Sequence, residues 1–186
     1  MRTQESEEKN LNKWFIMPNI LITGQPRVGK TSLINKAVEL LNKKVVGFVT
    51  NEVRINNKRI GFDIQSYSGL ILPLASKDNF QSKYKVASYG VFVENVDRIV
   101  NQIEEDLQSI NYNLIILDEI GKMELLSSKF KKLVLNCLDK RCVLGTIMLS
   151  DNDFTSRIKN RTDTVVFKLT EANRNQAINE ISKLMR

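Results

Sequence analysis

The sequence predicts a three-layer α/β fold, in which a mostly parallel sheet is covered by helices on both faces. Two observations lead to this prediction. Short apolar runs alternate with segments whose apolar residues recur at helical spacing, which indicates alternating strands and helices. One stretch of closely spaced strand patterns interrupts this alternation, which is why the sheet is expected to be mostly and not wholly parallel. Alternating strands and helices are typical of parallel sheets, because two parallel strands need a long crossover that is usually a helix. The length of 186 residues suits one such domain.

The individual elements follow from the apolar spacing. Apolar runs predict strands over residues 20–23, 45–50, 114–117, 143–147 and 164–169. Helical spacing predicts helices over residues 30–42, 96–110, 128–138, 153–159 and 175–185. Residues 53–55, 60–66 and 70–74 are short strand patterns separated by Asn56-Asn57 and Ser68-Gly69, which predicts an antiparallel β-hairpin insertion. Residues 75–94 give no clear pattern.

The start of the chain differs from the rest. Residues 1–17 are charged or amide-rich up to Trp14 and Phe15, and we expect them to form a flexible extension to a domain over residues 18–186. The alternative is a tail that packs these two aromatic side chains onto the domain. Glu5 and its acidic neighbours argue against a targeting peptide, because such peptides are poor in acids.

Composition excludes several classes of protein. No apolar run approaches the ~20 residues of a membrane span, so we expect no membrane partner. The chain has no histidine and only two cysteines, Cys137 and Cys142, which argues against a zinc site, a histidine-dependent catalytic triad and a structural disulfide. A reduced, cytoplasmic setting and a monomer are the simplest expectations. The net charge of +7 is scattered, which favours a solvated basic surface over a nucleic-acid interface.

A glycine-containing loop is the strongest local signal. Residues 24–31 fit the pattern G-x-x-x-x-G-K-[ST] at each fixed position, and they lie between a predicted strand and a predicted helix. This arrangement directs backbone N–H groups and the positive end of a helix dipole at phosphate. We expect Lys30 to reach the β- and γ-phosphates of a nucleotide and Thr31 to bind Mg²⁺. The expected nucleotide contacts here are Gly24, Gln25, Pro26, Arg27, Val28, Gly29, Lys30, Thr31 and Ser32.

Two acids follow an apolar strand later in the chain. In a parallel α/β sheet, ligands bind at the carboxyl ends of the strands, so Asp118 should meet the Mg²⁺ held by Thr31. Glu119 is then placed to orient and deprotonate an attacking water. The expected nucleotide-binding stretch around them is Ile115, Ile116, Leu117, Asp118, Glu119, Ile120, Gly121 and Lys122.

Other polar residues are candidates with open alternatives. Arg157 or Arg161 could neutralise charge on the γ-phosphate, or either could be a solvated surface arginine. Asn173 and Arg174 follow the last strand, where a base or ribose could bind. Lys122 could contact the nucleotide or pair with Glu124. In the insertion, Glu52 and Arg54 would suit a second substrate or simply the surface of the hairpin.

Residues 118–125, Asp-Glu-Ile-Gly-Lys-Met-Glu-Leu, form a long and specific string. It resembles the signature of the cancer-related nucleoside-triphosphatase family, whose microbial members are also called nucleotide kinases. Further stretches that resemble family blocks are residues 22–33, 47–54, 59–63, 144–147, 161–163 and 173–174. The resemblance runs from residue 20 to about residue 180 and leaves out the N-terminal extension.

The resemblance implies a P-loop NTPase fold that hydrolyses several nucleoside triphosphates, including ATP and GTP, to the diphosphate and phosphate. It also implies that the phosphate loop and residues 118–122 bind nucleotide. The sequence departs from the family pattern at three places. Arg27 replaces a usual glycine, Asn51 replaces a common acid, and residues 148–150 replace a proline-containing run.

Three functions remain to be distinguished. The leading hypothesis is a Mg²⁺-dependent nucleoside-triphosphatase with Glu119 as the base. The alternative is a kinase that transfers the γ-phosphate to a small acceptor near Glu52 and Arg54, although no arginine-rich lid segment is present. The third is a nucleic-acid-binding module in which the phosphate loop is a switch, suggested only by the positive charge.

Overall fold

The computed structural model describes residues 17–185, and a nine-stranded sheet forms its centre. Across the sheet the strands lie in the order β5-β6-β4-β3-β2-β7-β8-β1-β9. Five neighbouring strands are parallel: β2, β7, β8, β1 and β9. Their bounds are Val45–Ile55 for β2, Leu114–Ile120 for β7, Val143–Ile147 for β8, Asn19–Thr23 for β1 and Thr164–Lys168 for β9. The predicted α/β class with a mostly parallel sheet is confirmed.

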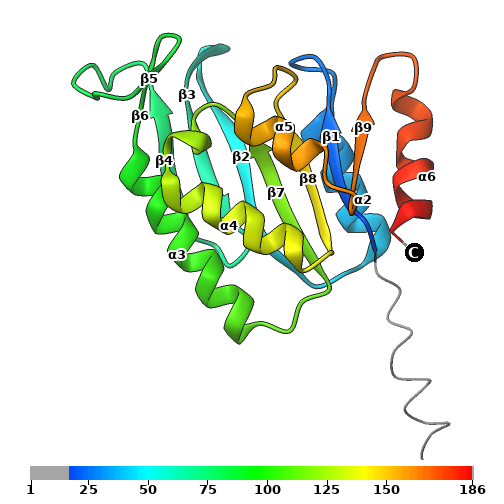
Figure 1. Cartoon of the computed structure of the whole chain (residues 1–186). Coiled ribbons are helices and arrows are strands. Elements are labelled where there is room, and N and C mark those ends of the chain that lie inside the picture. Colours follow the sequence, from blue (N-terminus) through cyan, green and yellow to red (C-terminus); the bar gives the residue numbers. More distant parts are fainter. Residues whose placement is uncertain (1–16, 186) are drawn as a thin grey trace, which may run out of the picture.

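Helices cover both faces of this sheet, which makes the three layers visible in Figure 1. On one face lie α3 (Val93–Ser109), α4 (Ser128–Asp139), α5 (Asp153–Lys159) and the short 3-10 helix η1 (Glu124–Leu126). On the other face lie α2 (Lys30–Leu41) and α6 (Arg174–Leu184). The parallel strands are apolar on both sides, as in the fully buried run Leu114–Leu117 of β7, because each side packs against a helix layer.

The remaining strands are the predicted antiparallel insertion. β2 continues past the parallel region and pairs with β3 (Lys58–Ser66), which pairs with β4 (Ile71–Ser76). Asn56 and Asn57 connect β2 to β3 with φ angles of 48° and 62°. Two consecutive positive φ angles define a tight hairpin turn that asparagine tolerates. The stretch without a sequence pattern contains β5 (Lys85–Val86) and β6 (Tyr89–Val91), which extend this edge of the sheet.

Differences from the predicted boundaries are small, apart from β2, β7 and the start of α3, which begins at Val93 and not at residue 96. β7 includes the two acids and ends at Ile120, after a register shift against β8 between Leu117 and Ile120. At the N-terminus, the alternative in which Trp14 and Phe15 pack on the domain concerns residues outside the described range. None of the helices in residues 17–185 is long and apolar enough to span a membrane.

Candidate functional site

The phosphate loop lies at the carboxyl end of β1 and runs directly into α2. Gly24 is needed there because a Cβ atom at this position would lie 2.5 Å from the backbone oxygen of Leu169, just after β9. Gly29 caps the start of α2 with a φ of 104°, in the region that glycine adopts without strain. Arg27 has a φ of 67°, which explains why a glycine is usual at this position. The conformation of the loop thus depends on the backbone at Gly24, Arg27 and Gly29.

Lys30 folds back over this loop. Its Nζ atom donates to the backbone oxygens of Gly24 at 3.2 Å and Gln25 at 3.3 Å. The loop residues Gln25, Pro26 and Arg27 are exposed, whereas the side chain of Val28 is buried in the core between the sheet and α2. The ammonium group therefore lies inside a turn of exposed backbone, next to the positive end of the α2 dipole, where an anion is favoured.

Asp118 lies two strands away from β1, in β7, and is buried with 1% of its surface exposed. Thr146, at the end of the intervening strand β8, donates its hydroxyl to Oδ1 of Asp118. Oδ2 of Asp118 has no hydrogen-bond partner among residues 17–185. Burial raises the pKa of Asp118, while the hydroxyls of Thr146 and Thr31 and the charge of Lys30 act in the opposite direction. The phosphate loop and Asp118 are therefore neighbours, as the sequence predicts.

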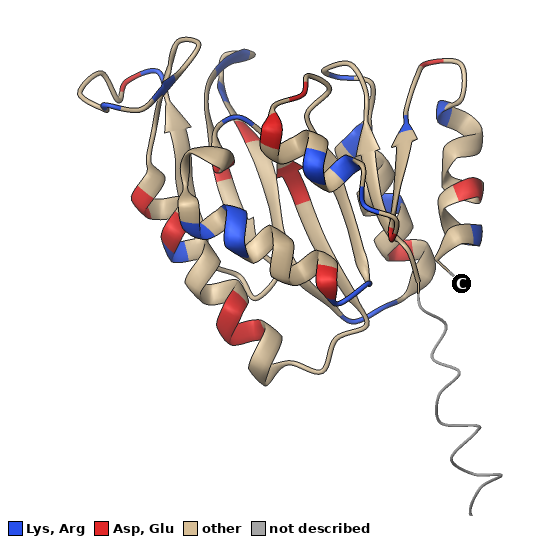
Figure 2. Ribbon diagram, viewed as in Figure 1, with Lys and Arg blue, Asp and Glu red and all other residues tan. Residues whose placement is uncertain are grey.

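Glu119 is half-buried beside this aspartate. Burial raises the pKa of its carboxyl, Lys30 lowers it and Asp118 raises it further. Both Asp118 and Glu119 thus lie within the electrostatic reach of the phosphate-loop lysine. Figure 2 shows these acids as a red end on an otherwise uncharged β7. A carboxylate with a raised pKa at this edge is chemically suited to accept a proton from water.

Three of the four buried polar side-chain atoms without partners in residues 17–185 lie at the same edge of the sheet. The four atoms are Oγ1 of Thr23, Oγ1 of Thr50, Oδ2 of Asp118 and Oγ of Ser182. The atoms of Thr23, Thr50 and Asp118 belong to β1, β2 and β7. They lie near the carboxyl ends of the segments in which these strands pair in parallel. Unpartnered buried oxygens are costly and indicate a missing ligand, ion or water. Because Mg²⁺ prefers oxygen ligands, Asp118 and Thr31 fit the group that the sequence predicts here.

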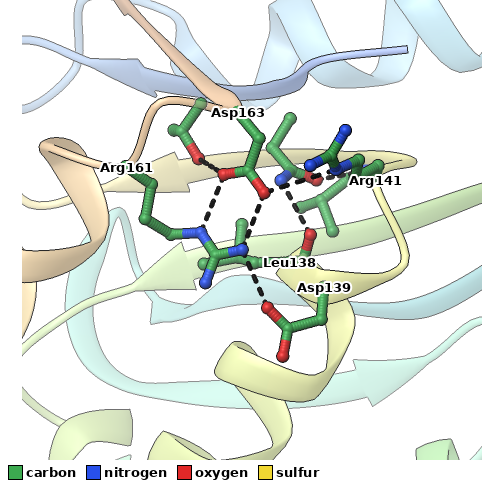
Figure 3. A network of polar contacts seen from close by, with 8 residues as sticks. Leu138, Asp139, Arg141, Arg161 and Asp163 are labelled. Carbon is green, nitrogen blue, oxygen red and sulfur yellow. Dashed lines mark hydrogen bonds and ion pairs between the residues drawn. The ribbon is translucent and has the colours of Figure 1, made fainter. Parts of the chain in front are cut away.

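Arg161 is not at this edge, and its predicted role at the γ-phosphate is wrong. It lies just before β9, at the amino ends of the parallel strands. There its guanidinium donates to Asp163 at 2.7 and 2.8 Å and to Asp139, the last residue of α4, at 2.8 Å. Figure 3 shows this network, with Arg141 on the other side of Asp163. Hydrogen bonds from Arg161 lower the pKa of Asp163, as expected for a structural ion pair.

The other predicted arginines and their neighbours have different surroundings. Arg174 begins α6 next to the phosphate loop, where a Cβ atom on Gly29 would lie 3.5 Å from its Cδ. Asn173 is held by backbone contacts: its Nδ2 donates to the oxygen of Lys168 and its Oδ1 accepts from the amide of Thr170. Arg157 is exposed on α5. The structure therefore brings Asn173 and Arg174, but not Arg161, to the loop.

Several residues predicted to contact nucleotide have side chains in the core. The side chains of Ile115, Ile116, Leu117 and Ile120 are completely buried in the two apolar clusters, where they position the acids. Any contact of these residues with nucleotide would come from their backbone and stays a prediction. Lys122 is exposed and Glu124 is buried, with no ion pair between them among the contacts of residues 17–185, so the suggested pairing is also wrong.

In the insertion, Glu52 and Arg54 contact each other on the exposed surface of the hairpin, and Arg59 donates to Glu52 at 2.7 Å. Burial raises the pKa of Glu52, but hydrogen bonds from Arg59 and Arg54 outweigh it and lower the pKa. These side chains satisfy one another, which favours the surface interpretation over a second-substrate site.

Sequence reasoning missed two residues of the site. The strand pattern gives Thr146 no role of its own, yet its hydroxyl orients Asp118. The sequence suggests Glu124 only as a partner of Lys122, yet Glu124 is 3% exposed and close enough to Glu119 and Asp118 for both to raise its pKa. The sequence carries one signal for each, namely a polar residue within an apolar run. Thr146 stands near the end of an apolar strand, and Glu124 stands between Met123 and Leu125.

A phosphate loop before α2, a facing aspartate and an adjacent glutamate together define a P-loop nucleoside-triphosphatase. Comparison with known proteins agrees. Residues 19–182 match a family described as NTPase. The chain is 45% identical over 169 residues to the nucleoside-triphosphatase THEP1 of Thermotoga maritima, covering 90% of this chain and 95% of the relative.

Two solved structures share the fold. The crystal structure of THEP1 from Aquifex aeolicus has a TM-score of 0.78 and 37% identity, covering 90% of this chain and 99% of that one. The solution structure of a human cancer-related nucleoside triphosphatase has a TM-score of 0.75 and 32% identity, covering 91% and 97%. The chain belongs to this family of nucleoside-triphosphatases. The predicted resemblance and class of enzyme are confirmed, and none of these relatives is named as a kinase.

Proposed function

We propose that this chain hydrolyses nucleoside triphosphates, ATP and GTP among them, to the diphosphate and phosphate with Mg²⁺. One observation carries the proposal. A buried aspartate with an unpartnered oxygen lies beside the threonine and lysine of a phosphate loop, and the next residue along the strand is a half-buried glutamate. Phosphoryl transfer to water needs these groups together: donors for phosphate, oxygen ligands for a metal, and a base for the water.

Each residue of the site has a distinct role in this proposal. Lys30 leaves the carbonyls of Gly24 and Gln25 to bind the β- and γ-phosphates, together with the loop amides. Thr31 and Asp118 would hold Mg²⁺, which would supply positive charge against the phosphate oxygens. Thr146 keeps Asp118 oriented by its hydrogen bond. Glu119 orients a water and accepts its proton as the water attacks the γ-phosphorus.

The remaining contacts are assigned by position. Arg174 lies against the phosphate loop and is our candidate for a contact to phosphate or ribose, with Asn173 fixing the turn that leads into it. Ser32 is exposed in the first turn of α2, next to Thr31. Arg157 stays a candidate for the γ-phosphate that only mutation will test. The base is not assigned to any residue, in keeping with a broad choice of nucleoside triphosphate.

A steady-state screen tests this function. Phosphate release is measured with ATP, GTP, CTP and UTP, with Mg²⁺ and with EDTA, and with a panel of nucleosides and nucleoside monophosphates as acceptors. The proposal expects metal-dependent release of phosphate that no acceptor accelerates. A phosphorylated acceptor formed faster than free phosphate would instead establish the kinase.

The setting of the activity is also proposed. Free Cys137 and Cys142 are consistent with a reducing cytoplasm. Figure 2 shows Lys and Arg spread over several helices and loops, which favours a protein that acts on small nucleotides over one that binds nucleic acid. We expect a monomer, and the division into an extension over residues 1–17 and a domain over residues 18–186 stays a prediction.

A further inference from the structure

A third acid lies next to the proposed base, and the function described so far does not use it. Glu124 opens η1, immediately after the turn that follows β7, and is 3% exposed. Backbone hydrogen bonds close this turn: the amide of Leu125 donates to Gly121 at 3.1 Å, and the amide of Ser127 donates to Glu124 at 3.0 Å. The position of the Glu124 side chain is therefore set by a fixed piece of backbone.

The carboxyl group of Glu124 covers Gly121 from the same side as Glu119. A Cβ atom on Gly121 would lie 2.9 Å from Oε2 of Glu124, 3.4 Å from Cγ of Glu119 and 3.5 Å from Oε1 of Glu119. The two glutamate side chains thus share the space that this glycine leaves open. The φ angle of Gly121 is not positive, so the backbone conformation does not require glycine here. The absence of a side chain instead leaves room for the two glutamate side chains.

No cation balances this buried acid in residues 17–185, where Glu124 makes no ion pair and no side-chain hydrogen bond to another side chain. Burial, with the charges of Glu119 and Asp118 in the same direction, raises the pKa of Glu124 to about 8, against weaker opposition from the backbone amides of Glu124 and Gly121. On the helices that pack against η1, Asp97 accepts from Ser127 and Lys129 donates to Asn101. A carboxyl in these surroundings is mostly uncharged at neutral pH.

We propose that Glu124 is a positioning residue, whose carboxyl group packs beside Glu119 over Gly121 and holds that side chain in place for water activation. The inference rests on the proposed role of Glu119 as the base. A neutral carboxylic acid carries an O–H donor that a neighbouring carboxylate can accept, whereas a second carboxylate would repel it. Loss of the packing lets Glu119 adopt other rotamers, and small displacements of a catalytic group are costly to the rate.

The test compares four variants by steady-state kinetics and thermal melting. Glu124→Ala removes the packing and should lower kcat about tenfold or more, with KM for ATP within about twofold because the phosphate loop is intact. Glu124→Gln keeps the shape, the donor and the neutral charge, and should stay within about threefold of wild-type kcat. Gly121→Ala places a methyl group between the two glutamates and should resemble Glu124→Ala. Glu105→Ala, exposed on α3, is the surface control.

A pH profile supplies a readout that a purely structural role would not move. Wild-type kcat should fall above about pH 8, where Glu124 ionises beside Glu119, and Glu124→Gln should lack this fall because its amide does not ionise. If Glu124→Gln loses as much activity as Glu124→Ala, or if Glu124→Ala and Gly121→Ala keep wild-type kcat, the inference is overturned. Wild-type turnover in Glu119→Gln would overturn the proposed base instead, so the two failures are distinguishable.

Discussion

The two ends of the parallel strands both carry clustered charges, but the charges have opposite surroundings. At the amino ends, Arg161 lies between Asp163 and Asp139, and each of these carboxylates has a cationic partner. At the carboxyl ends, Asp118 and Glu124 are almost completely buried, and neither has an ion-pair partner among residues 17–185. The pKa of Asp163 is lowered, whereas the pKa values of Asp118 and Glu124 are raised.

This difference distinguishes charges that hold the fold together from charges that are available to a ligand. A charged side chain that forms an ion pair within the chain has its hydrogen-bonding groups occupied and is less available to bind a ligand. A buried acid without a partner costs stability, and natural proteins keep such groups mainly where chemistry needs them. The amino ends of the sheet are therefore held together by the protein alone. In the proposed function, phosphate, metal and water would complete the carboxyl ends.

The largest effect is expected from Glu119→Gln, which removes the proposed base without changing its shape. Phosphate release should slow by ~10² or more, because glutamine cannot accept the proton of the attacking water. The affinity for nucleotide should persist, since the phosphate loop and Asp118 are unchanged. Single-turnover hydrolysis and calorimetric titration with a non-hydrolysable ATP analogue measure the two quantities.

Glu105→Gln, on the exposed side of α3, is the matched control for this change. Its turnover should equal that of the wild type. If Glu119→Gln also turns over at the wild-type rate, the carboxyl ends of the sheet bind nucleotide by other chemistry, and the contrast between the two edges loses its catalytic meaning.

Gly24→Ala should have the next largest effect, because it forces a methyl group to within 2.5 Å of the Leu169 carbonyl oxygen. Local strain of about 1–3 kcal/mol at the loop corresponds to nucleotide binding weaker by about fivefold to 150-fold. Gly69→Ala is the control: its φ is also positive, at 104°, but nothing lies within 4 Å of the added atom and the phosphate loop is distant in sequence. Equal nucleotide affinity in the two variants would contradict the packing argument.

Much of the fold was predictable because helix and strand periodicities are local. The boundaries of β1, α2, β8 and α5 follow from apolar spacing and from the loop residues beside them. The stretch over residues 75–94 was not readable, because β5 and β6 have two and three residues and are held by pairing with β4. Strands that short carry no period of their own, so only the neighbouring strand reveals them.

The site was predictable where a motif fixes a backbone shape, and not where a role depends on distant neighbours. The loop around Lys30 and the acid pair at Asp118 are encoded by spacing. Arg161 precedes the predicted last strand, so in a parallel sheet its place in the sequence already indicates the amino ends of the strands, opposite the phosphate loop. Glu124 was overlooked because its burial over Gly121 depends on how the turn after β7 closes.

Arg161→Ala should change stability and leave catalysis alone. It removes hydrogen bonds from Asp163, whose side chain is 12% exposed, and we expect a loss of about 1–2 kcal/mol in the free energy of unfolding. For a chain of this length that corresponds to a melting temperature lower by about 2–8 °C. Turnover should stay within about twofold of wild type. A large loss of kcat at an unchanged melting temperature would restore Arg161 to the active site.

The melting temperature of Arg161→Ala at acidic pH gives a second test of this ion pair. Because the folded-state pKa of Asp163 lies below its ordinary value, the stability it contributes is fully present above that ordinary value of 3.8 and is lost as pH falls through the folded-state pKa. Arg161→Ala removes the main cause of the lowered pKa, so the difference in melting temperature between wild type and variant should shrink as the pH falls below about 4.

Arg54→Ala should have the smallest effect. Its partner Glu52 keeps Arg59, which donates to the other carboxylate oxygen at 2.7 Å, and both Arg54 and Glu52 are exposed. Exposed ion pairs of this kind contribute little, so the melting temperature should fall by about 2 °C at most and ATP hydrolysis should be unchanged. The variant also tests the acceptor alternative. If Arg54→Ala abolished transfer of phosphate to a small acceptor while hydrolysis persisted, the hairpin would be a second-substrate site, and satisfied ion pairs would no longer mark the purely structural parts of this protein.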